Sequence, residues 1–220
     1  KTDKPILAIQ TNGGAVGQPL QYSWTRDIPE TVVMEIINQF KDKYTILHIK
    51  REDQPIYPDT LQALDSFRSI AILLSLSKKR LLMDSSAMHI ARSIGLSSVV
   101  LWVGTNPKVF GYENNQNIIA NPPTKEINLE HNHYLKHLLF EDLGTIPYHD
   151  LNEVFDIDTI IEAIKNGAIP IVLEGSQGPE EILSEFNSLI IRESDYISKT
   201  IDIYKSIFEG EKAYILSREL

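Results

Sequence analysis

The sequence has no cysteine and no hydrophobic run long enough to span a membrane. Without cysteine the chain forms neither disulfides nor thiolate metal sites, a composition that fits a cytoplasmic location. A transmembrane helix needs about 20 consecutive apolar residues, and no such run or signal-peptide pattern is present. We therefore expect a cytoplasmic protein without a transmembrane segment.

An excess of positive charge is also absent. The 220 residues include 21 Lys and Arg against 30 Asp and Glu, which gives a net charge of -9. This balance argues against nucleic acid or an anionic membrane as the main partner, although it permits a local basic site for a phosphate. With 42% hydrophobic residues, the chain can form one large domain, or one domain with an appendage.

The sequence contains no complete motif for binding a dinucleotide or a nucleoside triphosphate. Residues 11–17 (TNGGAVG) follow the first apolar segment, but they match neither the dinucleotide glycine pattern nor a phosphate loop with its lysine. This loop is either a flexible connection or a close approach of the backbone to a ligand. Residues 174–178 (EGSQG) lack the following Gly-Lys-Ser/Thr, which excludes an NTPase.

The most informative stretch is residues 81–104, which the pattern predicts as strand, turn, helix and strand. Residues 81–83 are strand-like, residues 84–86 can turn the chain and cap a helix, and Gly95 ends that helix. A helix that leaves the carboxyl end of a strand directs its free N–H groups at the ligand, where they favour a phosphate. For Asp84 and Ser85, helix capping is the structural alternative to ligand contact.

The other elements alternate in the same way. Strands are predicted at residues 5–10, 44–49 and 117–120, with a further short strand at 61–64. Helices are predicted after Asp27, which forms a capping box with Glu30, after Ser66 or Ser69, and over residues 156–165 up to Gly167. This alternation predicts an α/β, Rossmann-like fold, a mostly parallel sheet with helices on both faces.

Residues 84–91 (DSSAMHIA), followed by a strand and the loop 103–107 (VGTNP), resemble the donor-site signature of the heptosyltransferase-like glycosyltransferases, family nine. That signature reads Asp, Ser or Thr, Gly, two variable positions, His, Leu or Ile, and Ala, followed by a strand and a Gly-x-Thr-x-Pro-type loop. The resemblance covers about residues 5–120. Trp24 also matches, whereas Ser86 replaces the family's glycine and Tyr22 replaces its phosphate-binding lysine.

The resemblance implies a set of donor-binding residues. The backbone N–H groups after Asp84 would hold the donor phosphate, Glu52 would bind the ribose, and Lys50 or Arg51 would lie near the diphosphate. Asp84 would orient the donor sugar or fix the turn, and His89 would contact phosphate or support that turn. For the charged run after the second strand, a solvated cluster is the alternative. The full set is Gly13, Gly14, Arg26, Lys50, Arg51, Glu52, Asp84, Ser85, Ser86, Ala87, His89, Gly104 and Thr105.

The implied architecture is one half of a GT-B enzyme, with residues 1–125 as the donor-binding domain and residues 126–220 as a C-terminal α/β extension packed on it. The implied reaction is metal-independent, inverting transfer of a sugar from a nucleotide-diphosphate sugar to an acceptor hydroxyl, in lipopolysaccharide or other surface-glycan synthesis. No cofactor is required. The catalytic base and the glycan or lipid-linked acceptor would belong to an N-terminal half outside these residues. We therefore expect a fragment that is inactive alone and that, in the whole enzyme, contacts the inner face of a membrane peripherally.

Two other functions remain open on the sequence. A Rossmann-like binding or scaffolding module without donor chemistry is favoured by the Ser86 and Tyr22 departures. A sugar-nucleotide epimerase would need carboxylates and histidines across the cleft, and none can be placed. His133 and His137 have the i,i+4 spacing of metal ligands, but without a carboxylate motif they are better explained as surface or packing residues.

Overall fold

The computed structural model describes residues 4–13, 23–63, 66–125 and 146–167. These belong to a compact unit, Pro5–Ile171, apart from Lys4, which belongs to a second unit with residues 172–220. The elements predicted beyond residue 167, together with His133 and His137, lie outside the described residues. The domain boundary at residue 125 stays a prediction.

The centre of the described part is a six-stranded sheet whose neighbouring strands are all parallel. The strands lie in the order β3-β2-β1-β4-β5-β6. The central strand β1 pairs with β2 on one side, where Ile9 is opposite His48, and with β4 on the other, where Ile9 is opposite Leu81. The strands are β1 (Ile6–Ile9), β2 (Thr45–Ile49), β3 (Thr60–Ala63), β4 (Lys79–Met83), β5 (Val99–Trp102) and β6 (Gln116–Ile119).

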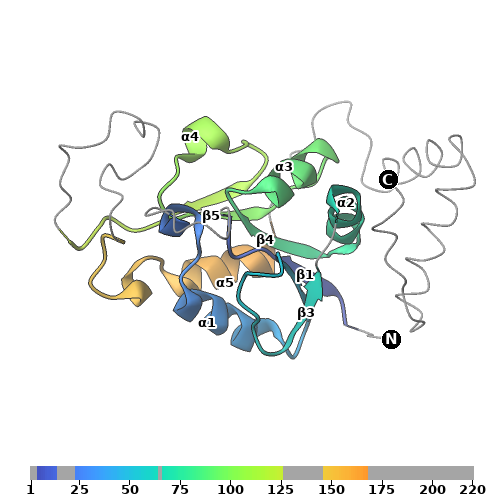
Figure 1. Ribbon diagram of the computed structural model, residues 1–220, viewed down its shortest axis with the longest axis horizontal. Coiled ribbons are helices and arrows are strands. Elements are labelled where there is room, and N and C mark those ends of the chain that lie inside the picture. Colours follow the sequence, from blue (N-terminus) through green and yellow to red (C-terminus); the bar gives the residue numbers. More distant parts are fainter. Residues whose placement is uncertain (1–3, 14–22, 64–65, 126–145, 168–220) are drawn as a thin grey trace, which may run out of the picture. The chain divides into compact units, whose positions relative to one another are not determined.

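Helices cover both faces of this sheet, which confirms the predicted α/β class (Figure 1). The helices α1 and α5 pack against each other on one face, and α2 and α3 pack together on the other. Short helical segments lie in the connections. The helical elements are η1 (Ser23–Arg26), α1 (Glu30–Phe40), α2 (Phe67–Leu76), α3 (Ser86–Ser93), α4 (Pro107–Phe110), η4 (Leu151–Glu153) and α5 (Ile157–Asn166).

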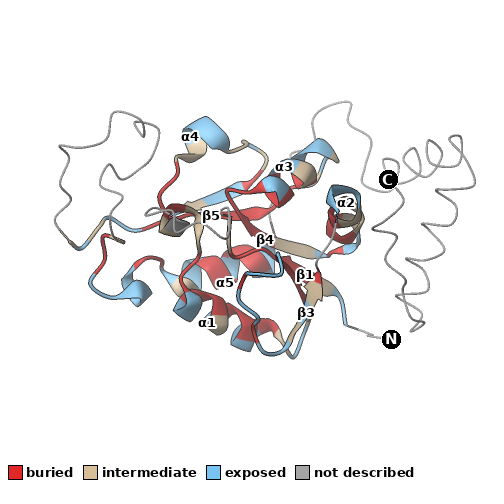
Figure 2. Cartoon of the chain, viewed as in Figure 1, coloured by how far each residue is buried: buried red, intermediate tan, exposed pale blue. Residues whose placement is uncertain are grey.

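The largest hydrophobic cluster lies between the sheet and the pair α1 and α5 (Figure 2). Alternate residues of the strands, such as Leu7 and Ile9 of β1, face this layer because side chains of a strand point to opposite faces in turn. The apolar residues that recur at helical spacing after Asp27 form the buried stripe of α1, which consists of Val32, Val33, Ile36, Ile37 and Phe40.

Most predicted helix ends are confirmed, with one correction. Ser66 caps α2, accepting a hydrogen bond from the N–H of Ser69, and glycines with φ of +76° follow the ends of α3 and α5. The capping box at Asp27 is wrong, because Pro29 is the N-cap of α1 and no side chain caps that helix. Asp27 instead accepts a hydrogen bond from the N–H of Gly13, at 3.2 Å. The hydrogen bond of Asp27 to the distant Gly13 thus replaces the local capping bond to α1.

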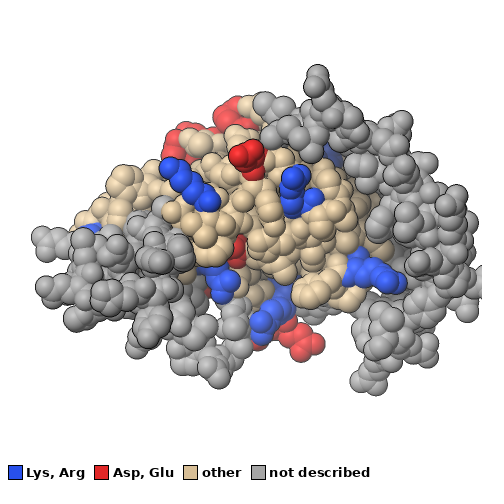
Figure 3. Space-filling view, turned by 90° about the horizontal axis from the view of Figure 1, so that it is seen from above, with Lys and Arg blue, Asp and Glu red and all other residues tan. Residues whose placement is uncertain are grey.

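The described surface has no extended basic face in the view of Figure 3, where Lys and Arg side chains lie apart from one another. This agrees with the net charge of -9. None of the described helices is long and apolar enough to cross a membrane.

Candidate functional site at the carboxyl ends of the strands

The strand order places a topological switch point between β1 and β4. From β1 the chain continues through α1 to β2 on one side, whereas from β4 it continues through α3 to β5 on the other. The two connections diverge at the carboxyl ends of these neighbouring strands. In open α/β sheets, ligands bind at that place.

Ser85 and Gln10 join the two diverging segments. The Ser85 hydroxyl donates a hydrogen bond to Oε1 of Gln10, and both side chains are buried. Ser85 is the N-cap residue of α3, but it makes no side-chain capping bond. The N–H groups of the first turn, beginning at Ser86 and Ala87, therefore have no capping side chain as acceptor. The start of α3 keeps its capacity to bind an anion.

Gly13 allows the loop after β1 to lie directly against the end of β4. A Cβ atom at this position would lie 2.7 Å from the carbonyl oxygen of Asp84 and 2.7 Å from Sδ of Met83. Both distances are shorter than real contacts of a Cβ atom. The glycine is thus required for packing at the switch point; Gly14 lies outside the described residues.

Three polar side chains at this edge are buried without a hydrogen-bond or ion-pair partner among the described residues. Lys50 follows β2 and is 6% exposed, Asp84 follows β4 and is 8% exposed, and Thr105 follows β5 and is 4% exposed. Oγ1 of Thr105 has no partner within this part of the chain. Because one strand separates β2 from β4, the backbones at Lys50 and Asp84 lie about 10 Å apart. Polar side chains that are largely buried and have no partner among the described residues mark this edge as a candidate binding site.

His48 is fully buried in β2 beside this edge. Its Nε2 forms a hydrogen bond with Oγ1 of Thr11 at 3.0 Å, and its ring packs on that of Tyr57. Burial, and secondarily the charge of Lys50, lowers the pKa of His48 to about 4. The imidazole is therefore neutral at physiological pH, and Lys50 lies close enough to affect it.

The remaining charged residues of the predicted site are more exposed. Arg51 and Glu52 are exposed, and Arg51 forms an ion pair with Asp53, with 3.5 Å between the charged atoms. Arg26 is half-buried in η1. Arg51 and Glu52 thus belong to a solvated charge cluster, which was the alternative that the sequence left open. Lys50 differs from them because it is buried.

His89 and Gly104 already have partners within the fold. His89 is exposed rather than buried, and its Nδ1 forms a hydrogen bond with Oη of Tyr112 at 2.7 Å, which links α3 to the loop after α4. The N–H of Gly104 donates to the carbonyl oxygen of Thr25 at 2.8 Å, so this N–H is not available to a ligand. Both residues support the position of loops around the edge.

The sequence did not indicate Gln10 or His48 as parts of this site, and it indicated Thr11 only as the first residue of the loop 11–17. His48 stands in an otherwise apolar strand (TILHI), and Gln10 directly follows one, so neither belongs to a recognisable motif. The only available signal was position, since all three lie at the carboxyl ends of predicted strands. Among the described residues, no group of three His, Asp or Glu side chains could hold a metal ion.

The strand order defines an α/β protein with a Rossmann-type parallel sheet. No family model and no curated protein matches the chain. Solved structures do match it. One is E. coli heptosyltransferase WaaC with ADP, at 14% identity and a TM-score of 0.49, over 76% of this chain and 45% of that one. Another is the family 9 glycosyl transferase of Veillonella parvula DSM 2008, at 18% identity and a TM-score of 0.46, over 76% of this chain and 47% of that one. A further match is E. coli ADP-heptose lps heptosyltransferase II, at 15% identity and a TM-score of 0.43, over 57% of this chain and 41% of that one.

The chain thus spans less than half the length of these three structures. They are glycosyltransferases of the class that the sequence resembles. At such identities and TM-scores, the likeness assigns neither a substrate nor a role to any residue.

The packing of Gly13 gives a first testable prediction. Gly13→Ala should lower the free energy of unfolding by about 1–3 kcal/mol, because the added methyl group overpacks the end of β4. Urea unfolding followed by circular dichroism measures this change. Ser86→Ala, at an exposed position at the start of α3, is the control and should leave stability nearly unchanged. Equal stability of Gly13→Ala and the wild type would contradict the close approach.

The buried imidazole of His48 gives a second prediction. The unfolded chain takes up a proton on this side chain near pH 6.5, whereas the folded chain does so only near pH 4. The unfolded state therefore binds more protons between these values, and stability falls as the pH is lowered through this window. Between about pH 7 and pH 5, His48 should account for about 2 kcal/mol of lost stability.

His48→Gln keeps a polar partner for Thr11 but does not titrate, so its stability should fall less over the same pH range. Comparing the two proteins by urea unfolding at each pH cancels the contribution of the other titrating groups. Parallel pH profiles of the two proteins would show that the imidazole is not held neutral in the folded state.

Proposed function

We propose that this chain is the donor-binding part of a glycosyltransferase that moves a sugar from a nucleotide-diphosphate sugar to an acceptor hydroxyl. The observation that carries the proposal is the uncapped start of α3, directly after β4 at the switch point of the sheet. The position of the signature residues 84–91 at this place supports it, because it is where an α/β sheet binds phosphate groups.

The N–H groups of Ser86 and Ala87 hold the diphosphate in this proposal, aided by the positive end of the α3 dipole. Lys50 supplies the cation. Lys50 is 6% exposed and its side chain has no hydrogen-bond or ion-pair partner among the described residues, so it can pair with the ligand. A charge in such a place interacts strongly with an anion, and no water has to be rearranged when charge develops on the leaving diphosphate. No metal ion or cofactor is needed for this stabilisation.

Asp84 provides the complementary polar contact. Its carboxylate is buried at the end of β4 and can accept hydrogen bonds from sugar hydroxyls. Thr105, with its unpartnered buried hydroxyl, can donate to the same ligand from the end of β5. Glu52 is exposed after β2, where it can reach a ribose hydroxyl.

The full reaction requires a second half that binds the acceptor and supplies the base that activates its hydroxyl. In that enzyme the transfer inverts the anomeric carbon, the acceptor is a glycan or a lipid-linked sugar, and the product belongs to lipopolysaccharide or another surface glycan. The contact with the membrane is peripheral, at its cytoplasmic side. The 220 residues alone then bind the donor without turnover.

A binding or scaffolding module without donor chemistry is the second candidate function. The observation that favours it is Ser86, whose Cβ and hydroxyl stand at the first position of α3, where the resembling family has glycine. A phosphate that approaches this turn meets a side chain. Failure of the folded chain to bind any nucleotide diphosphate would support this second function.

Calorimetric titration of the chain with ADP, UDP, GDP and CMP, with and without common sugars, tests the proposal. One nucleotide should bind, and Lys50→Met should weaken it by about tenfold or more, since a charge-assisted hydrogen bond is lost. The same substitution should leave stability unchanged or raised, because it removes an unpaired buried charge.

Lys43→Met is the matched control, since Lys43 is exposed just before the opposite end of the same strand. It should bind the nucleotide as the wild type does. If Lys50→Met and the wild type bind equally, Lys50 does not hold the diphosphate. If Lys50→Met unfolds, the ammonium group is a structural element instead.

A further inference from the structure

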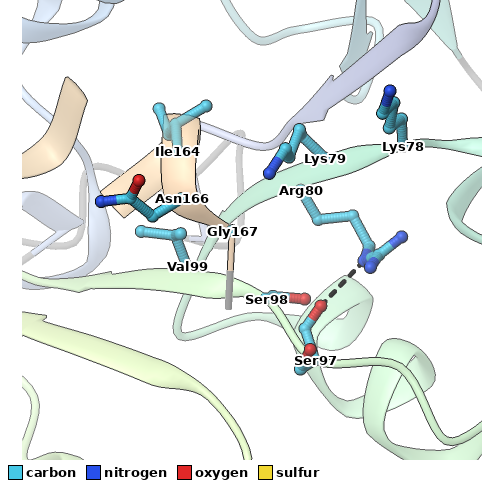
Figure 4. A pocket seen from close by; sticks show the side chains of 9 residues that line it. All are labelled: Lys78, Lys79, Arg80, Ser97, Ser98, Val99, Ile164, Asn166 and Gly167. Carbon is cyan, nitrogen blue, oxygen red and sulfur yellow. Dashed lines mark hydrogen bonds between the residues drawn. The ribbon is translucent and has the colours of Figure 1, made fainter. Parts of the chain in front are cut away.

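A second polar site lies at the opposite, amino-terminal ends of β4 and β5. It is a pocket of about 240 Å³ (Figure 4). Lys78, Lys79 and Arg80 line it at the start of β4, and Ser97 to Val99 line it at the start of β5. The last turn of α5 and Gly167 complete the wall. Because β4 has five residues, this pocket lies about 13 Å along the strand from the candidate donor site.

The pocket has a surplus of positive charge. Its lining contains three cations and no acidic residue. Arg80 donates from Nε to the carbonyl oxygen of Ser97 at 2.9 Å, and from Nη1 to those of Leu74 and Ser77 at 3.2 and 2.6 Å. These neutral acceptors fix the guanidinium group without balancing its charge. No ion pair forms between the three cations and any carboxylate among the described residues.

Lys79 has a different role from its neighbours. Its Nζ donates to the carbonyl oxygen of Lys165 at 2.9 Å, at the end of α5. A helix terminus of this kind carries about half a negative charge, which one ammonium group more than offsets. Burial, and then repulsion by Lys78 and Arg80, lowers the pKa of Lys79. The carbonyl groups at the end of α2 offset part of the Arg80 charge in the same way, whereas the Lys78 side chain forms no hydrogen bond or ion pair with the described residues.

Ser98 supplies an unsatisfied hydrogen-bonding group. Its side chain is 1% exposed, and its Oγ has no partner within the described residues. Its own N–H donates to Oδ1 of Asn115 at 3.0 Å, which fixes the backbone there. Figure 4 shows the hydroxyl turned toward the side on which Arg80 lies. A buried hydroxyl without a partner is costly unless a ligand satisfies it.

We infer that this pocket binds a phosphate group, free or as the monoester of a small molecule, through Arg80 and the Ser98 hydroxyl, with the charge of Lys78 at its rim, where Figure 4 shows the ammonium group turned away from Ser98. Phosphate matches this set because it carries up to two negative charges and several acceptor oxygens, so it can pair with two cations and accept from a hydroxyl at once. A carboxylate would balance only one of the two charges. The site is separate from the donor site and does not depend on the proposed function.

The test is a titration of the whole chain with inorganic phosphate and with glycerol 3-phosphate at constant ionic strength, followed by the thermal unfolding midpoint. Both variants of the pocket, Lys78→Gln and Ser98→Ala, should bind about three- to tenfold more weakly than the wild type, since Ser98→Ala loses a hydrogen bond to the anion and Lys78→Gln loses a nearby positive charge. Ser98→Ala removes a hydroxyl without a partner, so it should fold normally. Arg80 is left unchanged because its bonds to three carbonyl groups hold the fold together.

Lys108→Gln is the control, because it removes the same charge from an exposed position on α4. It should bind phosphate as the wild type does. Tighter binding of glycerol 3-phosphate would identify a monoester as the ligand, and equal binding would identify the free phosphate group.

Three outcomes would overturn the inference. One is the absence of any shift in the unfolding midpoint up to about 50 mM phosphate, the weakest binding expected of a specific site. Another is an equal loss in Lys108→Gln, which indicates general screening. The third is binding that survives Lys78→Gln and Ser98→Ala but is lost in Lys50→Met, which places the phosphate at α3. Failure of nucleotide binding in the preceding experiment leaves this test unaffected.

Discussion

The hydrogen bond between Ser85 and Gln10 determines what the carboxyl edge of the sheet can do. It holds together β1 and β4 at the point where their connections diverge. It also occupies the one side chain that stands in position to cap α3. A serine at an N-cap normally satisfies an amide group of the first turn, and here that acceptor is directed to the neighbouring strand instead. The first turn of α3 therefore has no capping side chain among the described residues at this switch point.

The same edge has another unusual feature, which is burial of charge without pairing. Lys50 and Asp84 are each more than nine-tenths buried, yet β1 lies between their strands. The backbones that carry these two side chains lie about 10 Å apart, and no ion pair joins the two side chains in the described part of the chain. A ligand with a phosphate at one end and hydroxyl groups at the other would satisfy both. His48 remains neutral beside Lys50, because burial and the ammonium charge both disfavour its protonation.

The sequence predicted the order and type of the elements well because each depends on local patterns. Alternating strands and helices, the buried stripe of α1, and the glycines after α3 and α5 are all readable in neighbouring residues. The strand order was within reach through the family resemblance, but not through periodicity. The capping box at Asp27 failed because its carboxylate binds the N–H of Gly13, a residue 14 positions away. Such a contact exists only after the fold has formed.

The site was predictable in position and only partly in chemistry. Asp84, Ser85 and Lys50 were selected because they follow strands, and the structure does bring the strand ends to one edge. No pattern could show that Ser85 binds Gln10, that Lys50 is buried while Arg51 pairs with Asp53, or that His89 binds Tyr112. These outcomes depend on which neighbour each side chain meets across the sheet. His48 and Ser98 were missed for the same reason, since burial gives each a function that its sequence neighbours do not indicate.

In a chain with a net charge of -9, the two anion sites that we propose lie at opposite ends of β4. At its carboxyl end the positive potential comes from a helix start and one buried lysine, which suits a ligand held by N–H groups. At the amino end of β4 the positive potential comes from side chains, because the adjacent end of α5 carries partial negative charge. Lys79 offsets that negative charge. Parallel strands place opposite helix ends at the two edges of the sheet. At the proposed site on the amino edge, the positive charge therefore has to come from side chains such as Lys78 and Arg80.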